Sequence, residues 1–342
     1  MNRSIMIVFA ALLAHMLDAA AAVETRAAGT RIVRLDPGLD RLIAPTTAVE
    51  RIATGFKFTE GPMWHAGRLW FSDLGDNKMY AVSRDGHVEL LIDHSGGLQT
   101  VPPGSYLGSN AMAPDKDGSV LMIQQGGRKI VRVSKDLHMS PFLDSFEHKR
   151  LNSPNDLVFA RDGALWFTDP PFGLPRLDQD PAKELKFNAV FRYANGTLTP
   201  VITDLTLPNG IGFSPDGKTL YVSNYGPRMY VNAYHVTANG RVSNPRVLIN
   251  YPDNSAGKGG PDGLKIDTAG NIWTTGPGGV RIITPRGRVL GLIEFGEVAA
   301  NVGFGEGGHA AWFTASTSIY RIELATPGQM PLRDPNPGAA PH

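Results

Sequence analysis

The chain has 342 residues, of which 42% are hydrophobic and 19% are charged, and its formal net charge is +1. This composition is typical of a globular protein, and no run of Lys or Arg exceeds two residues, which argues against a nucleic-acid or polyanion partner. The absence of cysteine excludes disulfides, thiolate nucleophiles and cysteine-ligated metals. The 39 Gly and 26 Pro residues favour many short strands joined by turns.

The first 22 residues are arranged like an export signal. Arg3 gives a positive start, residues 5–14 are apolar, and four alanines at 19–22 offer a cleavage site before Val23. The apolar core is shorter than the about 20 residues that a bilayer-spanning helix needs, and an uncleaved anchor is the alternative. We therefore expect a signal peptide at 1–22 and an exported protein, periplasmic or secreted, with no membrane attachment after cleavage.

After an N-terminal arm at 23–45, six segments share one plan: a polar residue, a strand, a glycine-containing turn and a more apolar strand. They begin at Glu60, Asn110, Asn155, Asn209, Asp262 and Asn301. The starts lie about 40 to 55 residues apart, which is the size of one four-stranded propeller blade. Three turns are Asp-Gly pairs, a strong hairpin signal. The sequence predicts an all-β, six-bladed β-propeller over 46–325, followed by a disordered, proline-rich tail at 326–342.

The repeat also predicts where six polar side chains meet. The innermost strand of each propeller blade lines the central channel, so equivalent residues at the strand starts converge near the axis. All six starts carry a side-chain oxygen and two are carboxylates, a donor set that suits a hard dication. We expect one divalent metal ion at one mouth of the channel, most simply Ca²⁺, with Zn²⁺, Mn²⁺, Mg²⁺ or Fe²⁺ as alternatives. The expected metal ligands are Glu60, Asn155, Asn209 and Asp262.

Further polar residues are expected around this mouth, because the second strand of each repeat runs back toward it. The strand ends predicted to surround the pocket are Asp73, Gln124, Asp169 and Asn224. The residues expected to bind substrate are Asn110, Gln124, Gln125, Asp169 and Asn301. For the strand ends, the alternative is an ordinary edge or turn residue.

Five motifs resemble the senescence marker protein 30/gluconolactonase family, and in particular its exported bacterial gluconolactonases. They are EGPMW (60–64), LNSPNDLVF (151–159), WFTDPPFGL (166–174), LPNGIGFSPDGKTLYVSN (207–224) and PDGLKID (261–267). The resemblance covers about residues 45–325. It implies a six-bladed propeller that holds Ca²⁺ or another divalent ion and hydrolyses sugar lactones. By motif, the family's metal ligands fall on the same four positions, and its substrate-side Asn falls on Asn110.

The chain departs from the family pattern at two places near the pocket. Many bacterial gluconolactonases have Glu-His-Gly where this chain has Gln124, Gln125 and Gly126, and some members have Arg at the position of Gly108. Both changes remove charged groups from the pocket wall, so the particular lactone stays open.

The predicted activity is metal-dependent hydrolysis of an aldonolactone, such as gluconolactone, to its acid, with no nucleic acid and no obligate protein partner. The ion would polarise the carbonyl, and Asp262 is the expected catalytic residue, either as the base for water or as a nucleophile. A serine-hydrolase motif of the form G-x-S-x-G is absent. The alternatives are a related propeller that cleaves other esters or phosphotriesters, and a non-enzymatic binding propeller stabilised by calcium.

Overall fold

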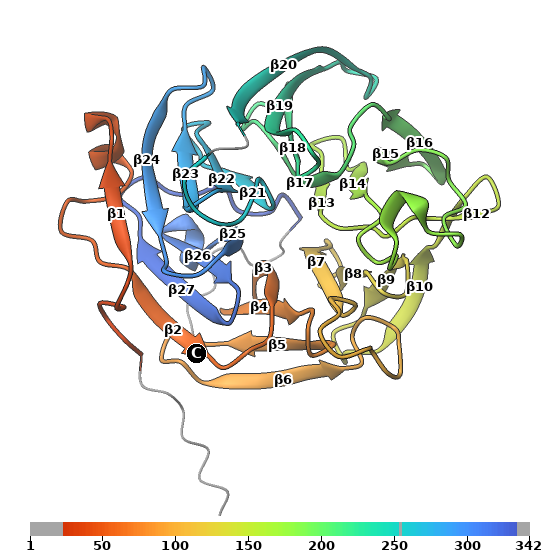
Figure 1. Cartoon of the computed structure of the whole chain (residues 1–342), viewed down its shortest axis with the longest axis horizontal. Helices are drawn as coiled ribbons and strands as arrows, with labels where there is room; N and C mark the ends of the chain where they lie inside the picture. The colour runs from red at the N-terminus through yellow and green to blue at the C-terminus, as the bar shows by residue number, and fades with distance from the viewer. Residues whose placement is uncertain (1–22, 253–254, 334–342) are drawn as a thin grey trace, which may run out of the picture.

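The structure is a computed structural model that describes residues 23–252 and 255–333. Its strands form six antiparallel blades around a central axis, and the innermost strands meet near that axis (Figure 1). The prediction of an all-β propeller with six blades is confirmed. The predicted signal peptide at 1–22 lies outside the described residues. No helix in the described part of the chain is long and apolar enough to span a membrane.

Four blades are consecutive meanders whose strands follow one another in chain order from the axis outward. Blade 1 comprises β3 (Thr59–His65), β4 (Arg68–Asp73), β5 (Lys78–Val82) and β6 (Val88–Asp93). Blade 2 comprises β7 (Ser109–Pro114), β8 (Val120–Gln124), β9 (Lys129–Val133) and β10 (Met139–Leu143). Blade 3 comprises β13 (Leu157–Phe159), β14 (Leu165–Asp169), β15 (Ala189–Ala194) and β16 (Thr197–Ile202). Blade 4 comprises β17 (Pro208–Phe213), β18 (Thr219–Asn224), β19 (Met229–Val236) and β20 (Val242–Tyr251).

The last two blades each gain a strand from the N-terminal part of the chain. Blade 5 comprises β21 (Leu264–Ile266), β22 (Ile272–Gly276), β23 (Gly279–Ile283) and β24 (Val289–Glu294), and β1 (Arg31–Arg34) adds a fifth, outer strand. Blade 6 comprises β25 (Ala299–Gly305), β26 (Ala310–Ala315) and β27 (Ser318–Glu323), with β2 (Glu50–Thr54) outermost. The remaining elements are β11 (Ser145–Phe146), β12 (Lys149–Arg150) and three short 3₁₀ helices: η1 (Pro37–Arg41), η2 (Leu177–Gln179) and η3 (Glu306–Gly308).

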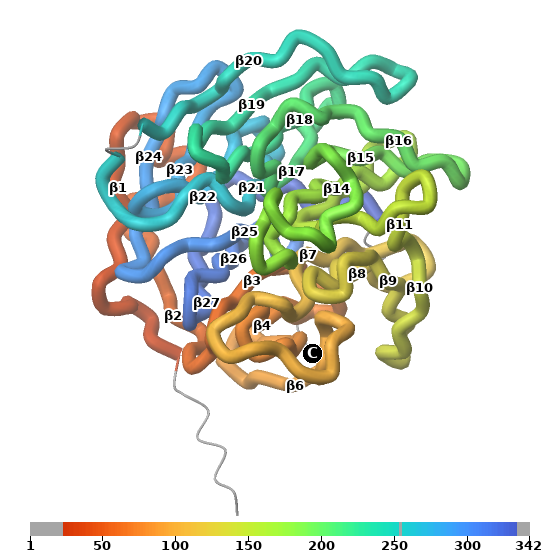
Figure 2. The backbone as a smooth tube through the Cα atoms, turned by 45° about the vertical axis from the view of Figure 1, so that its right-hand side comes forward, coloured from red at the N-terminus to blue at the C-terminus, as the bar shows by residue number. Residues whose placement is uncertain are grey.

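The pairing of β2 with β27 closes the ring, so segments from opposite ends of the chain lie side by side (Figure 2). A buried guanidinium supports this closure, since Arg321 of β27 lies 2.7 Å from a carboxylate oxygen of Glu50 on β2 and 2.7 Å from one of Glu306. The guanidinium is 2% exposed, and its pairing with two carboxylates means that this buried charge is not left without a partner. The expected N-terminal arm at 23–45 thus supplies the outermost strand of blade 5, and β2, which follows the arm, is the outermost strand of blade 6.

The turns and the core follow the repeat seen in the sequence. The Asp-Gly turns bring Gly118 and Gly217 to φ values of 78° and 74°, which residues with a Cβ adopt rarely. Apolar side chains form six buried clusters among the described residues, and each cluster is shared between two neighbouring blades. Large rings such as Trp166 and Trp273 are at most 1% exposed and fill the space between blades.

The beginning of the C-terminal tail packs across the channel mouth opposite the polar strand starts. Residues 329–332, together with inner-strand side chains, line a small cavity there. Arg333 then reaches blades 2 and 3, where it lies 2.9 Å from Asp115 and its guanidinium carbon lies 4.0 Å from the ring centroid of Phe159. Disorder was predicted from residue 326, and this is wrong for 326–333 because these contacts hold the segment; residues 334–342 lie outside the described chain.

Candidate active site at the mouth of the channel

The six predicted ring residues all lie at the starts of the inner strands. Their side chains come from all six blades, and five of them are at most 5% exposed, whereas Asp262 is partly exposed. Together they form the polar end of the channel. A cavity of about 270 Å³ opens at this mouth. Its polar floor consists of Glu60, Asn110, Gln125, Asn155, Asn209 and Asp262.

Glycines after two ring residues allow neighbouring blades to approach closely. A Cβ on Gly61, which follows Glu60, would lie 2.4 Å from the backbone oxygen of Asn110. A Cβ on Gly263, which follows Asp262, would lie 1.9 Å from the side chain of Asn301. Contacts this short are impossible for real side chains, so only glycine lets the ring close at these points.

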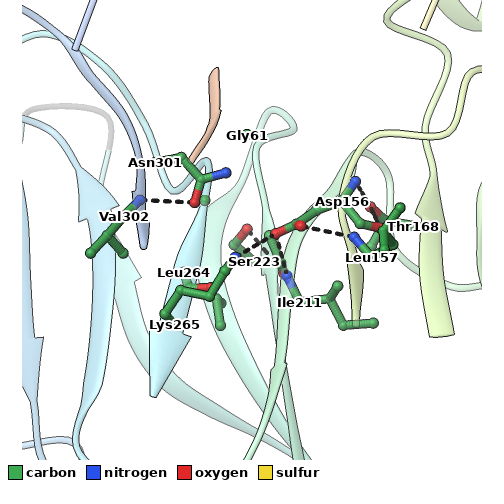
Figure 3. A network of polar contacts seen from close by, with 12 residues as sticks. Gly61, Asp156, Leu157, Thr168, Ile211, Ser223, Leu264, Lys265, Asn301 and Val302 are labelled. Carbon is green, nitrogen blue, oxygen red and sulfur yellow. Dashed lines mark hydrogen bonds and ion pairs between the residues drawn. The ribbon is translucent and has the colours of Figure 1, made fainter. Parts of the chain in front are cut away.

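Glu60 is held by donors on one of its two carboxylate oxygens. Oε2 accepts a hydrogen bond from the backbone N–H of Gly61 at 2.6 Å and another from Nδ2 of Asn301 at 2.9 Å. The oxygen of the Asn301 amide is itself fixed, because it accepts from the N–H of Val302 at 2.9 Å (Figure 3). Asn301 therefore supports Glu60 and does not line the cavity, which departs from its predicted role in binding substrate.

Both ring carboxylates have a raised proton affinity. Burial raises the pKa of Glu60 to about 7, against the hydrogen bonds from Asn301 and Gly61. Burial, and after it the charge of Glu60, raises the pKa of Asp262 well above its ordinary value. Two carboxylates in such a place attract either protons or a cation.

A third carboxylate lies beneath the ring, and the sequence analysis missed it. Asp156 is 2% exposed and accepts hydrogen bonds from the backbone N–H groups of Leu157 and Ile211, while Nζ of Lys265 lies 3.3 Å from its Oδ2 (Figure 3). Its contacts thus join blades 3, 4 and 5. The sequence does contain a signal for this pair, since each partner lies close to a predicted ring residue: Asp156 follows Asn155 directly, and Lys265 comes three residues after Asp262.

The residues at the ends of the second strands hold loops in place, although they were predicted to surround the pocket. Asp169 is fully buried and accepts hydrogen bonds from the backbone N–H groups of Asn152 and Ser153, both at 2.8 Å. Gln124 donates from Nε2 to the backbone oxygen of Ser95 at 3.0 Å. Neither side chain lines the cavity, so their predicted place on the pocket wall is corrected: each holds the loop that leads into the inner strand of its own blade.

The same correction applies to the other two strand ends, which do not line the cavity either. Asp73 accepts hydrogen bonds from the N–H groups of Lys57 and Phe58, and Asn224 accepts one from Leu207. Of the non-ring residues that were expected to bind substrate, Gln125 does line the cavity.

Above the polar floor, the cavity wall is apolar and largely aromatic. Its members are Phe58, Leu74, Tyr106, Phe172, Tyr225 and Val298. The rings of Phe58 and Tyr106 are 4.7 Å apart between centroids, and those of Phe172 and Tyr225 are 6.1 Å apart. No Lys, Arg or His is among the described residues that line the cavity, so it offers no counter-charge to an anionic ligand.

The donor set fits a hard dication. Two carboxylates with raised proton affinity supply charge, and amide side chains from the neighbouring strand starts supply neutral oxygens, as Ca²⁺ sites commonly do. Among the described residues, no group of three or more His, Cys, Asp or Glu side chains could hold a metal ion. A site here would therefore depend on amide oxygens beside its two carboxylates.

Comparison with known proteins shows the family to which this propeller belongs. The family model described as "SMP-30/Gluconolactonase/LRE-like region" matches residues 58–317, and the chain belongs to this family.

Two curated relatives are named for lactone hydrolysis. A gluconolactonase of Zymomonas mobilis is 36% identical over 312 residues, which is 87% of both chains. The pentonolactonase XacC of Haloferax volcanii is 25% identical over 238 residues, covering 67% of this chain and 69% of the relative.

A solved structure, the gluconolactonase XC5397 of Xanthomonas campestris, is 29% identical and superposes with a TM-score of 0.77 over 89% of this chain and 97% of its own. The predicted membership of the gluconolactonase family is thus confirmed, and lactone hydrolysis is supported.

Proposed function

We propose that this protein hydrolyses an uncharged sugar lactone to its aldonic acid, using one divalent cation, Ca²⁺ first among the candidates. The observation that carries the proposal is the cavity itself, where two carboxylates with raised proton affinity and several amides form the floor under an aromatic wall. A polyhydroxylated ring matches this lining, because its hydroxyls can bond the amides while its C–H faces contact aromatic rings.

The proposed cation ligands are Glu60, Asn155, Asn209 and Asp262. When bound, the cation would supply positive charge that polarises the lactone carbonyl and stabilises the developing oxyanion. With the two carboxylates ionised, Glu60 keeps a fixed orientation because Asn301 and Gly61 both donate to its Oε2.

Asp262 is the proposed base for the attacking water. It is the more exposed of the two carboxylates, so water reaches it more readily than Glu60. It accepts a proton as the water oxygen bonds to the carbonyl carbon, and it returns that proton to the ring oxygen when the ester bond breaks. The aromatic wall shields the bound ring from bulk water.

A panel of substrates tests this proposal. Base uptake at constant pH is followed with gluconolactone, galactonolactone, xylonolactone and arabinonolactone, and in parallel with a phosphotriester and an acyl-homoserine lactone. We expect acceleration over spontaneous opening for at least one sugar lactone, and little for the other two esters. Turnover of the phosphotriester alone would instead support the related propeller esterase, and no turnover at all would favour a binding propeller.

A further inference from the structure

Gln125 lies between the polar floor and the aromatic wall of the cavity. It is 2% exposed and comes directly after β8. Its Nε2 donates to the backbone oxygen of Tyr106 at 2.7 Å, and its Oε1 accepts from Nδ2 of Asn110 at 2.8 Å. Both ends of one amide side chain are thus bonded within the protein.

These two contacts determine which way each amide points. A backbone carbonyl only accepts hydrogen bonds, so the Tyr106 oxygen requires the NH₂ end of Gln125 to face it. The oxygen of Gln125 must then face Asn110, whose NH₂ group donates a hydrogen bond to it. The remaining atom of the Asn110 amide, Oδ1, is used in no hydrogen bond of the described residues, and Asn110 lines the cavity.

The neighbouring ring amide shows the contrast. Asn301 has both ends engaged, its oxygen by Val302 and its nitrogen by Glu60, and it does not line the cavity. Asn110 therefore differs from Asn301 in offering one atom of defined character to a ligand: a hydrogen-bond acceptor.

We propose that Gln125 is a positioning residue that fixes Asn110 as an acceptor for one hydroxyl of the bound lactone. The same side chain holds the loop segment that carries Tyr106, whose ring contacts Phe58 in the cavity wall. Gln125 thereby links the floor of the cavity to its wall. Its effect on the bound ring goes through Asn110, whose Oδ1 accepts a hydrogen bond from a hydroxyl of that ring. This inference rests on the proposed function, and it assigns Gln125 to substrate binding and not to the chemical step.

Loss of Gln125 should not unfold the loop, because other contacts anchor it. Gly127 donates to the backbone oxygen of Gly96 at 2.8 Å, and the side chain of Asn77 bonds Gly96 and Leu98. Gln125→Leu keeps the volume and removes both hydrogen bonds. Gln125→His keeps one hydrogen-bond donor and one acceptor at this position, because a neutral imidazole has one donor nitrogen and one acceptor nitrogen.

The test compares these variants on calcium-loaded protein with the best sugar lactone of the panel. For Gln125→Leu we expect KM to rise about tenfold, the worth of roughly one hydrogen bond, while kcat and calcium affinity stay within twofold. Gln125→His should restore most of the loss. In the double variant with Asn110→Ala, KM should match that of Asn110→Ala alone, because Gln125 acts through Asn110.

Three results would overturn the inference: an unchanged KM in Gln125→Leu, an equal loss in kcat or calcium affinity, or additive costs in the double variant. If Gln125→Leu does not fold, monodeoxy lactones give the answer without a change at Gln125. One missing hydroxyl should raise KM of the wild type about tenfold, and Asn110→Ala should abolish that discrimination. Wild-type protein that shows no such discrimination for any hydroxyl also contradicts the inference.

A binding measurement distinguishes failure of this inference from failure of the proposed function. Calorimetry with 1,5-anhydroglucitol, a ring without a lactone bond, measures binding whether or not hydrolysis occurs. Weaker binding in Gln125→Leu than in wild type supports the inference even if no lactone is hydrolysed. No binding to the wild type, together with no hydrolysis, contradicts both.

Discussion

Replacing Glu60 with Gln should separate calcium binding from the stability of the calcium-free protein. The side chain keeps its shape, and its neighbours fix how the new amide points. Asn301 and Gly61 both donate to Oε2 of Glu60, so the amide oxygen of Gln must take that place. Its NH₂ then faces the position proposed for the cation, where a carboxylate oxygen was before.

The expected loss of affinity is large, because the site has only two carboxylates. Two unit charges 4 Å apart interact by about 4 kcal/mol at an effective dielectric constant near 20. Part of this is offset by desolvation, so we expect calcium to bind at least about a hundredfold more weakly, roughly 2.7 kcal/mol. Calorimetric titration at pH 8 measures this, and calcium binding at wild-type strength would refute the ligand assignment.

The calcium-free protein should respond in the opposite direction. Because the pKa of Glu60 is raised to about 7, the folded protein holds a proton there that the unfolded chain has released. The stability from this proton is present below the ordinary carboxyl pKa and is lost as pH rises through about 7. Since Gln does not titrate, the variant should be at least as stable as wild type at pH 8 in a chelator, as thermal unfolding would show.

Asp169→Asn is the matched control. Asp169 is also a buried carboxyl whose pKa burial raises to about 7, but it accepts two backbone N–H groups and does not line the cavity. An Asn there must turn its NH₂ toward one of those donors, so stability should fall while calcium affinity stays unchanged. If calcium affinity falls in this variant as much as in Glu60→Gln, the effect is not specific to the ring.

Three further predictions concern protons, the ion pair beneath the ring and the tail. Because burial raises the pKa values of Glu60 and Asp262, calcium binding should release protons, and calcium affinity should rise from pH 6 to pH 8 by about tenfold per pH unit for each proton displaced. Calorimetry in buffers of different ionisation enthalpy detects the proton release. A calcium affinity that does not depend on pH would count against this prediction. Lys265→Met leaves the buried Asp156 carboxylate without its cation and should lower stability at pH 8 by about 1–3 kcal/mol. The same change should cost much less in an Asp156→Asn background, where no buried charge is left; urea unfolding measures both costs, and equal costs would contradict the pairing. Arg333→Met should lower the melting temperature by a few degrees and leave kcat unchanged, because Arg333 contacts Asp115 and Phe159, neither of which lines the candidate active-site cavity; a change in kcat without a change in melting would contradict this.

The repeat in the sequence was enough to predict the propeller and the meeting of its strand starts. Landmarks such as Glu60 and Asn209 recur at one register, and blade geometry turns register into spatial proximity. The pattern does not say which equivalent residue faces a ligand. Asn110 and Asn301 occupy the same place in the repeat, yet the N–H of Val302 and the carboxylate of Glu60 engage Asn301 while Asn110 lines the cavity.

Other features of the site depend on contacts between loops and strands far apart in the chain. Asp169 looked like a pocket residue because its strand ends near the mouth, but the loop before β13 covers it and uses both of its oxygens. Tyr106 belongs to a loop without a repeat, so periodicity could not place it in the wall. The tail has a composition typical of disorder, but the contacts of Arg333 with Asp115 and Phe159 hold its first residues in place.

Hydrolysis of gluconolactone by fully chelated protein, before and after calcium is restored, tests the central claim most directly. The account predicts that chelation reduces base uptake to the spontaneous rate, that one calcium ion per chain restores it, and that calcium does not restore it in Asp262→Asn. Chelated, folded protein that hydrolyses the lactone at the full rate would contradict the account.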